Sequence, residues 1–493
     1  MFHCGQNYCL AQFKSLALIG WLLLMVASLP ISAKRSKKVT AITSTVDGRT
    51  LLISKINAIK FRSEKENTFV MDDRQHYQTM DGFGAAITYS TAYNLMKMTP
   101  ADRHNFLEET YSLSKGWGYS YARISIGCSD FSSTEYTCCD TPGLENFRLH
   151  EDETKYIIPI LKEILAINPQ LKIIGSPWTC PRWMKVKDLE TLEPYNSWTD
   201  GYIHPKYYQT YADYFVKWIK AFEAEGIPIY AVTPQNEPLN RANCASTYVS
   251  WKEECELVRR MAPTFKRNGL KTKIYVFDHN YNYDNIASER EYPIKLYEAL
   301  AGESDMELLV GAAYHNYGGN MNELEKIHRL APNMKLIFSE ASIGTWNQGR
   351  DLRKSLLRDV EQICIGTVNR WCTAVVVWNL MLDLKRGPNL DGGCQTCFGA
   401  VDIDESNYRT IHRNSHYVAI AHLSSVVRPG AVRIGLQGAN LKGISAAAFC
   451  NPDRSHGLVF SNSNDAAQEI CVRDGQQLFQ TVLPAQSVVS FLW

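Results

Sequence analysis

Two glutamates, Glu237 and Glu340, are the residues of this sequence best suited to acid–base and nucleophilic chemistry. Each follows an apolar run that predicts a buried strand, residues 227–232 before Glu237 and 334–338 before Glu340. The two lie roughly 100 residues apart, close to three βα units of a barrel with roughly 30–35 residues per unit. Because the carboxyl ends of barrel strands share one rim, we expect both carboxylates to point into a single cleft.

Two carboxylates that face each other across a sugar can cleave a glycosidic bond. We predict that Glu237 is the acid/base, which must be protonated to assist the leaving oxygen, and that Glu340 is the ionised nucleophile. A neighbouring negative charge favours the protonated form of a carboxyl, so the pair is expected to have separated pKa values. A separation of roughly 5–5.5 Å would give retention through a covalent glycosyl-enzyme. Asn236 is suited to bind the 2-hydroxyl of the sugar.

The composition is that of an ordinary globular protein. The chain has 493 residues, of which 45% are hydrophobic and 21% charged, and its length predicts two or three domains. The formal net charge of +1 gives no reason to expect a nucleic-acid partner. The 11 Trp and 26 Tyr residues could stack on sugar rings, although core packing explains most of them equally well.

The N-terminus resembles an export signal. An apolar run from Leu16 to about Ser28 follows Lys14, and small residues near Ala33 predict cleavage, so residues 1–33 are interpreted as a signal peptide of a secreted protein. An uncleaved membrane anchor is the alternative, because the run approaches the length of a membrane span. No Asn-x-Ser/Thr sequon occurs in the chain, which disfavours a lysosomal address.

Several of the 14 cysteines fall where disulfides would suit an exported protein. Oxidised pairs are expected in the loops that hold Cys138 with Cys139 and Cys394 with Cys397, and Cys450 and Cys471 could staple the last domain. Zinc at Cys394 and Cys397 is the competing interpretation, but a structural zinc site needs a second pair of ligands with similar spacing.

Eight apolar runs alternate with helix-like segments through the middle of the chain. The runs cover residues 80–87, 121–127, 171–178, 227–237, 273–279, 308–317, 335–340 and 373–379, and residues 153–165 and 207–225 have helical periodicity. This alternation predicts an α/β fold, a (β/α)8 TIM barrel over residues 77–425. An open doubly wound sheet is the alternative, although no glycine-rich nucleotide motif follows the first run. His279, His315 and Trp378 stand where predicted strands end.

The two ends of the chain have a different pattern. Short alternating runs broken by Gly, Asn and Asp predict antiparallel strands, for example at residues 443–449, 457–460 and 487–493. We therefore expect an all-β sandwich built from residues 34–76 and 426–493. A role in stability is the simplest expectation for this side domain.

The motifs of the barrel are similar to those of glycoside hydrolase family 30. They are Gln78–Ile87 (QTMDGFGAAI), Cys128–Phe131 (CSDF), Gly175–Thr179 (GSPWT), Val232–Pro238 (VTPQNEP), Phe338–Ala341 (FSEA), Val377–Leu380 (VWNL) and Gly387–Asn389 (GPN). The likeness extends from about residue 68 to residue 493 in the same order. Within the family, the motifs most resemble those of the glucosylceramidases.

The resemblance implies retaining hydrolysis of a β-glucoside, with glucosylceramide as the expected substrate, peripheral contact with a membrane surface, and neither metal nor organic cofactor. It assigns Glu237 as acid/base and Glu340 as nucleophile, and it assigns the sugar contacts to Asp130, Trp178, Asn236 and Trp378. It further implies that His315 and Tyr317 support the nucleophile's side of the pocket, and that Arg123 orients the two glutamates. Trp178, Trp378 and His315 could also be ordinary core residues.

Two other functions remain open at this point. The first is hydrolysis of a polysaccharide such as β-1,6-glucan or xylan by a member of the same family. The second is a catalytically inactive glycan- or lipid-binding protein. Residues 240–246 and 390–397 depart from the glucosylceramidase pattern on the side of the leaving group, so the ceramide part of the inference has less support than the glucose part.

Overall fold

The computed structural model describes residues 38–60, 65–242 and 244–493. The predicted signal peptide over residues 1–33 lies outside these residues and stays a prediction. Among the helices of the described ranges, none combines the length and the apolar character that crossing a membrane requires.

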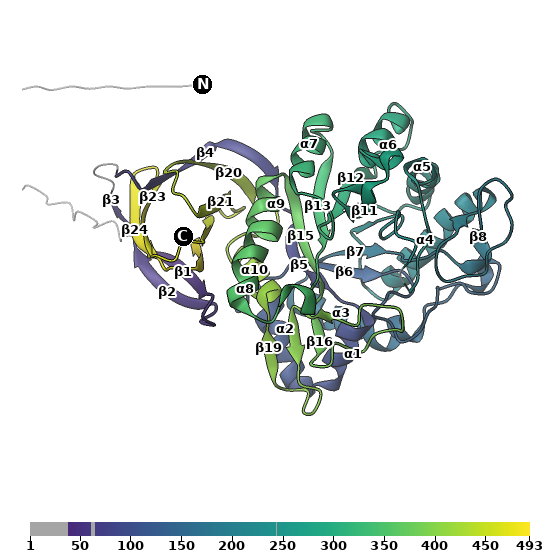
Figure 1. Cartoon of the computed structure of the whole chain (residues 1–493), viewed down its shortest axis with the longest axis horizontal. Helices are drawn as coiled ribbons and strands as arrows, with labels where there is room; N and C mark the ends of the chain where they lie inside the picture. Colours follow the sequence, from purple (N-terminus) through teal and green to yellow (C-terminus); the bar gives the residue numbers. More distant parts are fainter. Residues whose placement is uncertain (1–37, 61–64, 243) are drawn as a thin grey trace, which may run out of the picture. The chain divides into compact units, whose positions relative to one another are not determined.

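The middle of the chain forms a closed barrel of parallel strands (Figure 1), which confirms the predicted fold and excludes the open sheet. In chain order the strands are β5 Gly82–Ala86, β6 Tyr121–Ser125, β7 Lys172–Ser176, β10 Ala231–Val232, β11 Lys273–Asn280, β12 Leu309–His315, β13 Lys335–Glu340 and β15 Cys372–Asn379. Each strand pairs with the next, and β15 closes the ring by pairing with β5. Every one of the eight predicted apolar runs supplies one of these strands.

The interior of the barrel is a packed layer of side chains, as is usual for this fold. Tyr121 and Tyr275 are its largest members, and both are completely buried. The other members are Ile174, Ala231, Ala313, Ile337, Ala374 and Val376. Because this layer leaves no room for a ligand inside the barrel, functional groups must collect where the strands end.

Helices cover the outside of the barrel. They are α1 Tyr89–Lys97, α2 Pro100–Tyr111, α3 Ile158–Ile167, α4 Tyr208–Ala224, α5 Trp251–Arg267, α6 Tyr292–Leu300, α7 Asn322–Leu330, α8 Leu352–Asp359, α9 Gly366–Asn369 and α10 Ser415–Ser424. Helix α4 buries Tyr211, Phe215, Trp218 and Phe222, whose spacing of three or four residues places them on one face. The helix predicted from residue 153 begins as a π-helix, Asp152–Ile157, before α3.

Both ends of the chain contribute to one further sheet. Its strands are β1 Lys38–Thr45, β2 Leu52–Asn57, β3 Ile59–Lys60, β4 Thr68–Thr79, β20 Val432–Gly438, β21 Ile444–Cys450, β22 His456–Asn462, β23 Gln468–Asp474, β24 Gln477–Leu483 and β25 Ser487–Leu492. Their order is β2-β1-β25-β22-β21-β20-β4-β23-β24-β3. Phe69, Phe460, Phe479 and Phe491 share one buried core, so the sheet folds over itself as a sandwich. The predicted β-sandwich from both chain ends is confirmed, while its exact boundaries stay a prediction.

Short strands complete the connections at the barrel rim. They are β8 Lys185–Val186, β9 Tyr202–Ile203, β14 Ile343–Gly344, β16 Met381–Asp383, β17 Cys397–Phe398, β18 Val401–Ile403 and β19 Ile411–Arg413. Strand β14 pairs with β17, so the connection after Glu340 is tied to the segment that follows β15.

A buried histidine joins helix α10 to the sandwich. His422 has no exposed surface, and its ring nitrogens lie 2.8 Å from the hydroxyl oxygens of Ser44 on β1 and Ser490 on β25. Burial disfavours the charged ring and lowers the pKa of His422 from 6.5 to about 3. The neutral ring therefore bridges two strands that come from opposite ends of the chain.

We predict that replacing His422 by Gln removes a pH-dependent part of the stability. The pKa of His422 is depressed in the folded protein, so below about pH 6.5 this residue binds a proton in the unfolded chain but not in the folded one. Stability therefore falls as the pH drops toward 3. The slope is about 1.4 kcal/mol per pH unit in this window. Urea unfolding of both proteins between pH 8 and 4 should give a difference in unfolding free energy that shrinks as the pH falls. A difference that is constant with pH would contradict the neutral bridge.

Candidate active site

Both predicted catalytic glutamates line one cavity of about 340 Å³ at the carboxyl ends of the barrel strands. Glu237 follows β10, and Glu340 is the last residue of β13. Asp130, Trp178, Asn236, Tyr317 and Trp378 line the same cavity. Arg123 and His315, the two remaining predicted residues, are fully buried and bond to these glutamates. The predicted convergence is thus present in the structure, while the chemical role of each residue stays a prediction.

Glu340 is held by two donors. The guanidinium of Arg123 bonds to its Oε2, and the hydroxyl of Tyr317 donates to its Oε1 over 2.8 Å. Both carboxylate oxygens of Glu340 are thus engaged by hydrogen-bond donors. These contacts fix the orientation of the carboxylate.

Asp278 is a buried hub that the sequence analysis did not identify. Its carboxylate accepts hydrogen bonds from Arg123 at 2.8 Å and from His315 at 3.0 Å. Hydroxyl groups add three more, at 3.0, 2.8 and 2.6 Å, from Ser176, Thr233 and Ser339. Burial opposes ionisation of Asp278, but the charge of Arg123 and the bond from His315 hold its pKa well below the usual range. The residue therefore stays charged and connects the surroundings of both glutamates.

A β-bulge in β11 explains why Asp278 was missed. In a regular strand, successive side chains point to opposite faces, so Asp278 and His279 could not both face the site. The pairing of β11 with β12 shifts register between Phe277 and His279, and φ is 77° at Phe277 and 52° at Asp278. Bulges are common at barrel rims, where they redirect a side chain. Here the bulge brings two successive ionisable residues to the site, which an apolar run cannot reveal.

The surroundings of Glu237 differ from the expectation. His315 contacts Glu237, with Nδ1 3.1 Å from Oε1, whereas it was expected on the nucleophile's side of the pocket. Burial alone would raise the pKa of Glu237, but the hydrogen bond from His315 and the charge of His279 lower it. Burial would lower the pKa of His315, yet the charge of Glu340 and the bonds to Asp278 and Glu237 raise it. The proton is therefore expected on His315 and not on Glu237.

The tryptophans form one wall of the cavity. The rings of Trp178 and Trp378 are stacked, with centroids 5.2 Å apart, and the guanidinium of Arg123 lies 5.0 Å and 5.4 Å from them. A pair of flat apolar rings beside carboxylates suits a sugar, which has apolar faces and polar edges. Burial and the charge of Glu340 raise the pKa of Asp130 to about 7, so this carboxyl can donate or accept a hydrogen bond near neutral pH.

Two groups of side chains have the donor types of a metal site. Glu237, His279 and His315 each place one such atom within 4.8 Å of the others. Hydrogen bonds to carboxylates already engage both histidines of this group. The second group is Asp73, Cys450 and His456 in the sandwich. There both ring nitrogens of His456 already contact carboxylates, Nε2 at 2.9 Å from Asp73 and Nδ1 at 3.0 Å from Asp474.

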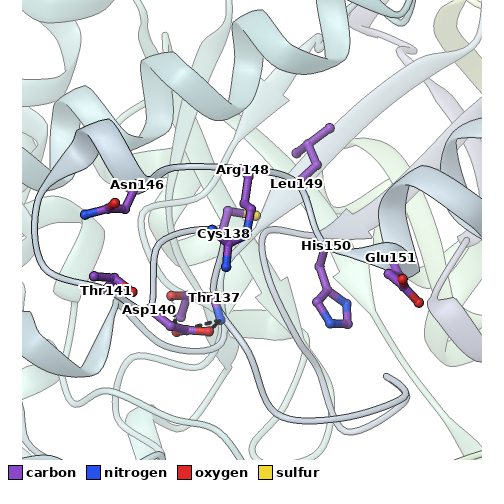
Figure 2. Close-up of a pocket in the computed structure, with 9 residues that line it drawn as sticks. All are labelled: Thr137, Cys138, Asp140, Thr141, Asn146, Arg148, Leu149, His150 and Glu151. Carbon is purple, nitrogen blue, oxygen red and sulfur yellow. Dashed lines mark hydrogen bonds between the residues drawn. The ribbon is translucent and has the colours of Figure 1, made fainter.

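A second cavity, of about 280 Å³, lies in the loop between β6 and α3 and contains neither glutamate. Figure 2 shows its lining, including Cys138, His150 and the bonded pair Thr137 and Asp140. The predicted oxidation of Cys138 with Cys139 is wrong, because both thiols are free. Their sulfurs point apart, Cys138 toward the carboxylate of Glu153 and Cys139 toward backbone carbonyls.

A disulfide shapes the mouth of the active-site cavity. Cys394 and Cys397 are joined, as predicted, which removes both from consideration as zinc thiolates. Both line the cavity, and the backbone N–H of Cys394 lies 3.4 Å from the carboxylate of Asp130. The predicted staple of Cys450 and Cys471 is wrong. Their strands, β21 and β23, are separated in the sheet by β20 and β4, so the two residues lie too far apart for a disulfide.

Comparison with known proteins agrees with this geometry. The family model described as the glycosyl hydrolase family 30 TIM-barrel domain matches residues 80–427, and that of the family 30 beta sandwich domain matches residues 430–491. The chain belongs to glycoside hydrolase family 30. It is therefore an O-glycosyl hydrolase of the β-glycoside-cleaving type that the barrel and the two glutamates indicated.

Three family 30 relatives show where the chain stands within the family. The solved structure of the endo-β-1,6-glucanase BT3312 is 57% identical, has a TM-score of 0.89, and the match covers 92% of this chain and 99% of that one. An endo-1,6-β-D-glucanase of Trichoderma harzianum is 30% identical over 84% of each chain. The lysosomal acid glucosylceramidase of Mus musculus is 26% identical over 91% of this chain and 88% of its own.

These similarities correct the predicted substrate. The expectation of glucosylceramide cleavage is wrong, since the chain is far more similar to a β-1,6-glucanase than to a glucosylceramidase. The expected membrane contact loses its basis with the lipid substrate. Segment 390–397, where the sequence had already departed from the glucosylceramidase pattern, contains the Cys394–Cys397 disulfide, and both cysteines line the cavity.

We predict that Asp278→Asn inactivates the enzyme. The change leaves Arg123 and His315 without their shared anion, and breaking a buried ion pair destabilises a protein by roughly 3–5 kcal/mol. Displacement of the glutamates should cost about 100-fold or more in kcat/KM, the scale that a misplacement of about 1 Å can produce. Activity on an aryl β-glucoside and thermal unfolding measure the two effects.

Asp81→Asn is the matched control. Asp81 is also buried between cations, Lys172 at 2.6 Å and Lys335 at 2.8 Å, but at the opposite end of the barrel. We expect a comparable loss of stability with kcat/KM retained within a few-fold below the unfolding temperature. If both variants lost activity equally, the effect of Asp278 would be one of stability alone.

Proposed function

We propose that this protein is an endo-β-1,6-glucanase that hydrolyses β-1,6-glucan with retention of anomeric configuration. The observation that carries the proposal is the 57% identity with an endo-β-1,6-glucanase along nearly the whole chain. The Trichoderma harzianum endo-1,6-β-D-glucanase supports the same substrate from a more distant comparison. The cavity adds independent support, because it brings two carboxylates and a pair of stacked tryptophans together.

The first step uses Glu340 as the nucleophile. Its carboxylate attacks the anomeric carbon of the glucose in the cavity, the bond from that carbon to O6 of the next glucose breaks, and a covalent glycosyl-enzyme forms. Arg123 and Tyr317 aim the carboxylate and stabilise its charge before the attack. In the second step water replaces Glu340 at the anomeric carbon.

The leaving O6 takes a proton from Glu237. This proton can reach Glu237 from His315 through the hydrogen bond between Nδ1 of His315 and Oε1 of Glu237, because the two residues share it. Asp278, at 3.0 Å from Nε2 of His315, fixes the ring. When the water attacks, its proton passes to Glu237 and the pair is restored.

The mouth of the cavity offers aromatic surfaces for neighbouring glucose units. Trp346 lines the cavity with 53% of its surface exposed, and Tyr317 does so with 44% exposed. Exposed rings at a sugar-binding cleft can stack on the apolar faces of glucose. We infer that they bind the glucose units on the leaving-group side.

We predict activity on β-1,6-glucan and on its oligomers, at least about 100-fold above that on β-1,3-glucan, xylan and glucosylceramide in kcat/KM. A pocket built to bond specific hydroxyls strongly rejects substrates that leave those bonds unmade. Product chromatography should show β-1,6-linked oligosaccharides first, and proton NMR of the first product should show the β-anomer. Preferred cleavage of glucosylceramide or xylan, or release of the α-anomer, would overturn the proposal.

The two glutamates are expected to respond differently to substitution. Glu340→Gln should lose at least about 10⁴-fold in kcat on every substrate, because no covalent intermediate forms. Glu237→Gln should lose as much on β-1,6-glucan but little in the first step with 2,4-dinitrophenyl β-glucoside, whose leaving group needs no proton. Added azide should restore its turnover and give β-glucosyl azide. Unchanged turnover in Glu340→Gln would remove the assigned mechanism.

A further inference from the structure

Glu237 lies between two imidazole rings, and the proposed mechanism uses only one of them. Oε1 of Glu237 is 3.1 Å from Nδ1 of His315 and 3.9 Å from Nδ1 of His279. The two rings are nearly perpendicular, at 84°, with centroids 6.4 Å apart. Both therefore approach the same carboxylate oxygen from different directions.

Each ring is backed by an aspartate on its far side. Nε2 of His315 lies 3.0 Å from Asp278, and Nε2 of His279 lies 2.9 Å from Asp284. A carboxylate behind a histidine fixes the ring orientation and stabilises its positive charge. Asp284 is in turn held by the amide of Asn280 at 3.2 Å. The structure thus contains two Asp–His pairs that converge on one oxygen of the acid/base.

The inner nitrogen of His279 has no hydrogen-bond partner among the described residues, although the ring is 1% exposed. A buried polar nitrogen without a partner is costly, and such an atom calls for an explanation. The nearest carboxylate oxygen on its open side is that of Glu237, which a shift of under about 1 Å would bring into hydrogen-bonding range. Since the ring is buried, it reaches the substrate only through Glu237.

We propose that His279, held by Asp284, is a positioning residue that favours the ionised form of Glu237 and so sets the pH range over which the enzyme works. The proposal rests on the proposed role of Glu237 as acid/base. The bulge in β11 makes it possible, because it lets Asp278 serve one histidine while His279 serves the glutamate. The charge of His279 lowers the pKa of Glu237, which agrees with a role in favouring its ionised form.

Other charged groups also act on Glu237, and the variant described below leaves them unchanged. Arg123 and His315 are cationic on β6 and β12, and Asp278 and Glu340 are anionic on β11 and β13. Asp130 lies in the loop after β6, and Asn240 donates to Oε2 of Glu237 over 2.8 Å. The variant should therefore change one charge in a constant background.

The test is the pH dependence of kcat/KM for His279→Gln on an aryl β-glucoside, with chelator present throughout. Loss of the proton that Glu237 and His315 share limits activity at high pH, so removal of a positive charge beside this pair should move this alkaline limb upward. An opposite charge at this distance shifts a carboxyl pKa by about 1–3 units, and we expect an upward shift of about one pH unit or more. A uniform loss at every pH, with the limb unmoved, would show a purely structural role and overturn the proposal.

Asp284→Asn is the second variant, chosen because Asp284 is partly exposed and tolerates change more easily. If Asp284 acts through His279, the limb should again move upward, by less than in His279→Gln. A downward shift would mean that Asp284 acts on Glu237 by its own negative charge, which would overturn the pairing. His456→Gln is the matched control, because His456 is also held by two aspartates, outside the cavity, and should leave the limb unchanged.

The aryl glucoside separates this proposal from the choice of natural substrate. Hydrolysis of the aryl glucoside without hydrolysis of β-1,6-glucan would refute the proposed substrate, and the pH dependence could still be measured.

A second measurement of the role of His279 needs no turnover. In ¹³C-Glu-labelled protein, the Glu237 carboxyl signal, assigned by its loss in Glu237→Gln, should titrate at higher pH in His279→Gln than in the unaltered chain. An unshifted titration would refute the role of His279.

Discussion

The buried ion pair between Arg123 and Asp278 is the interaction on which the site depends. Both side chains are fully buried, and their atoms approach to 2.8 Å. Removing two charges from water is expensive, so such a pair persists only when further hydrogen bonds satisfy both partners. Here Arg123 also bonds Glu340 and Asn236, and Asp278 also bonds His315. The nucleophile's side and the acid's side of the cavity are thereby joined through one charge pair.

The barrel makes this arrangement possible by its connectivity. Arg123, Asp278, His315 and Glu340 come from β6, β11, β12 and β13, and parallel strands deliver them to the same rim. The packed layer of side chains beneath them closes the interior. This buried layer supports the strand ends that carry the charged groups.

The charged groups around Glu237 determine its protonation state. Two carboxylates in one pocket were expected to leave the acid protonated. The imidazole rings of His315 and His279, 3.1 Å and 3.9 Å from Oε1 of Glu237, reverse this because they lower the pKa of Glu237. The proton is then expected on His315 and not on Glu237.

The sequence by itself determined the barrel, the sandwich from both chain ends, and the meeting of Glu237 with Glu340, because apolar runs, strand ends and short motifs are local properties. Its motifs also placed the chain in its family, but they misjudged the substrate. Only the tertiary structure decided the place of Asp278 and the partner of His315. The bulge and register shift in β11 arise from pairing with a neighbouring strand, and no pattern within residues 273–279 records them.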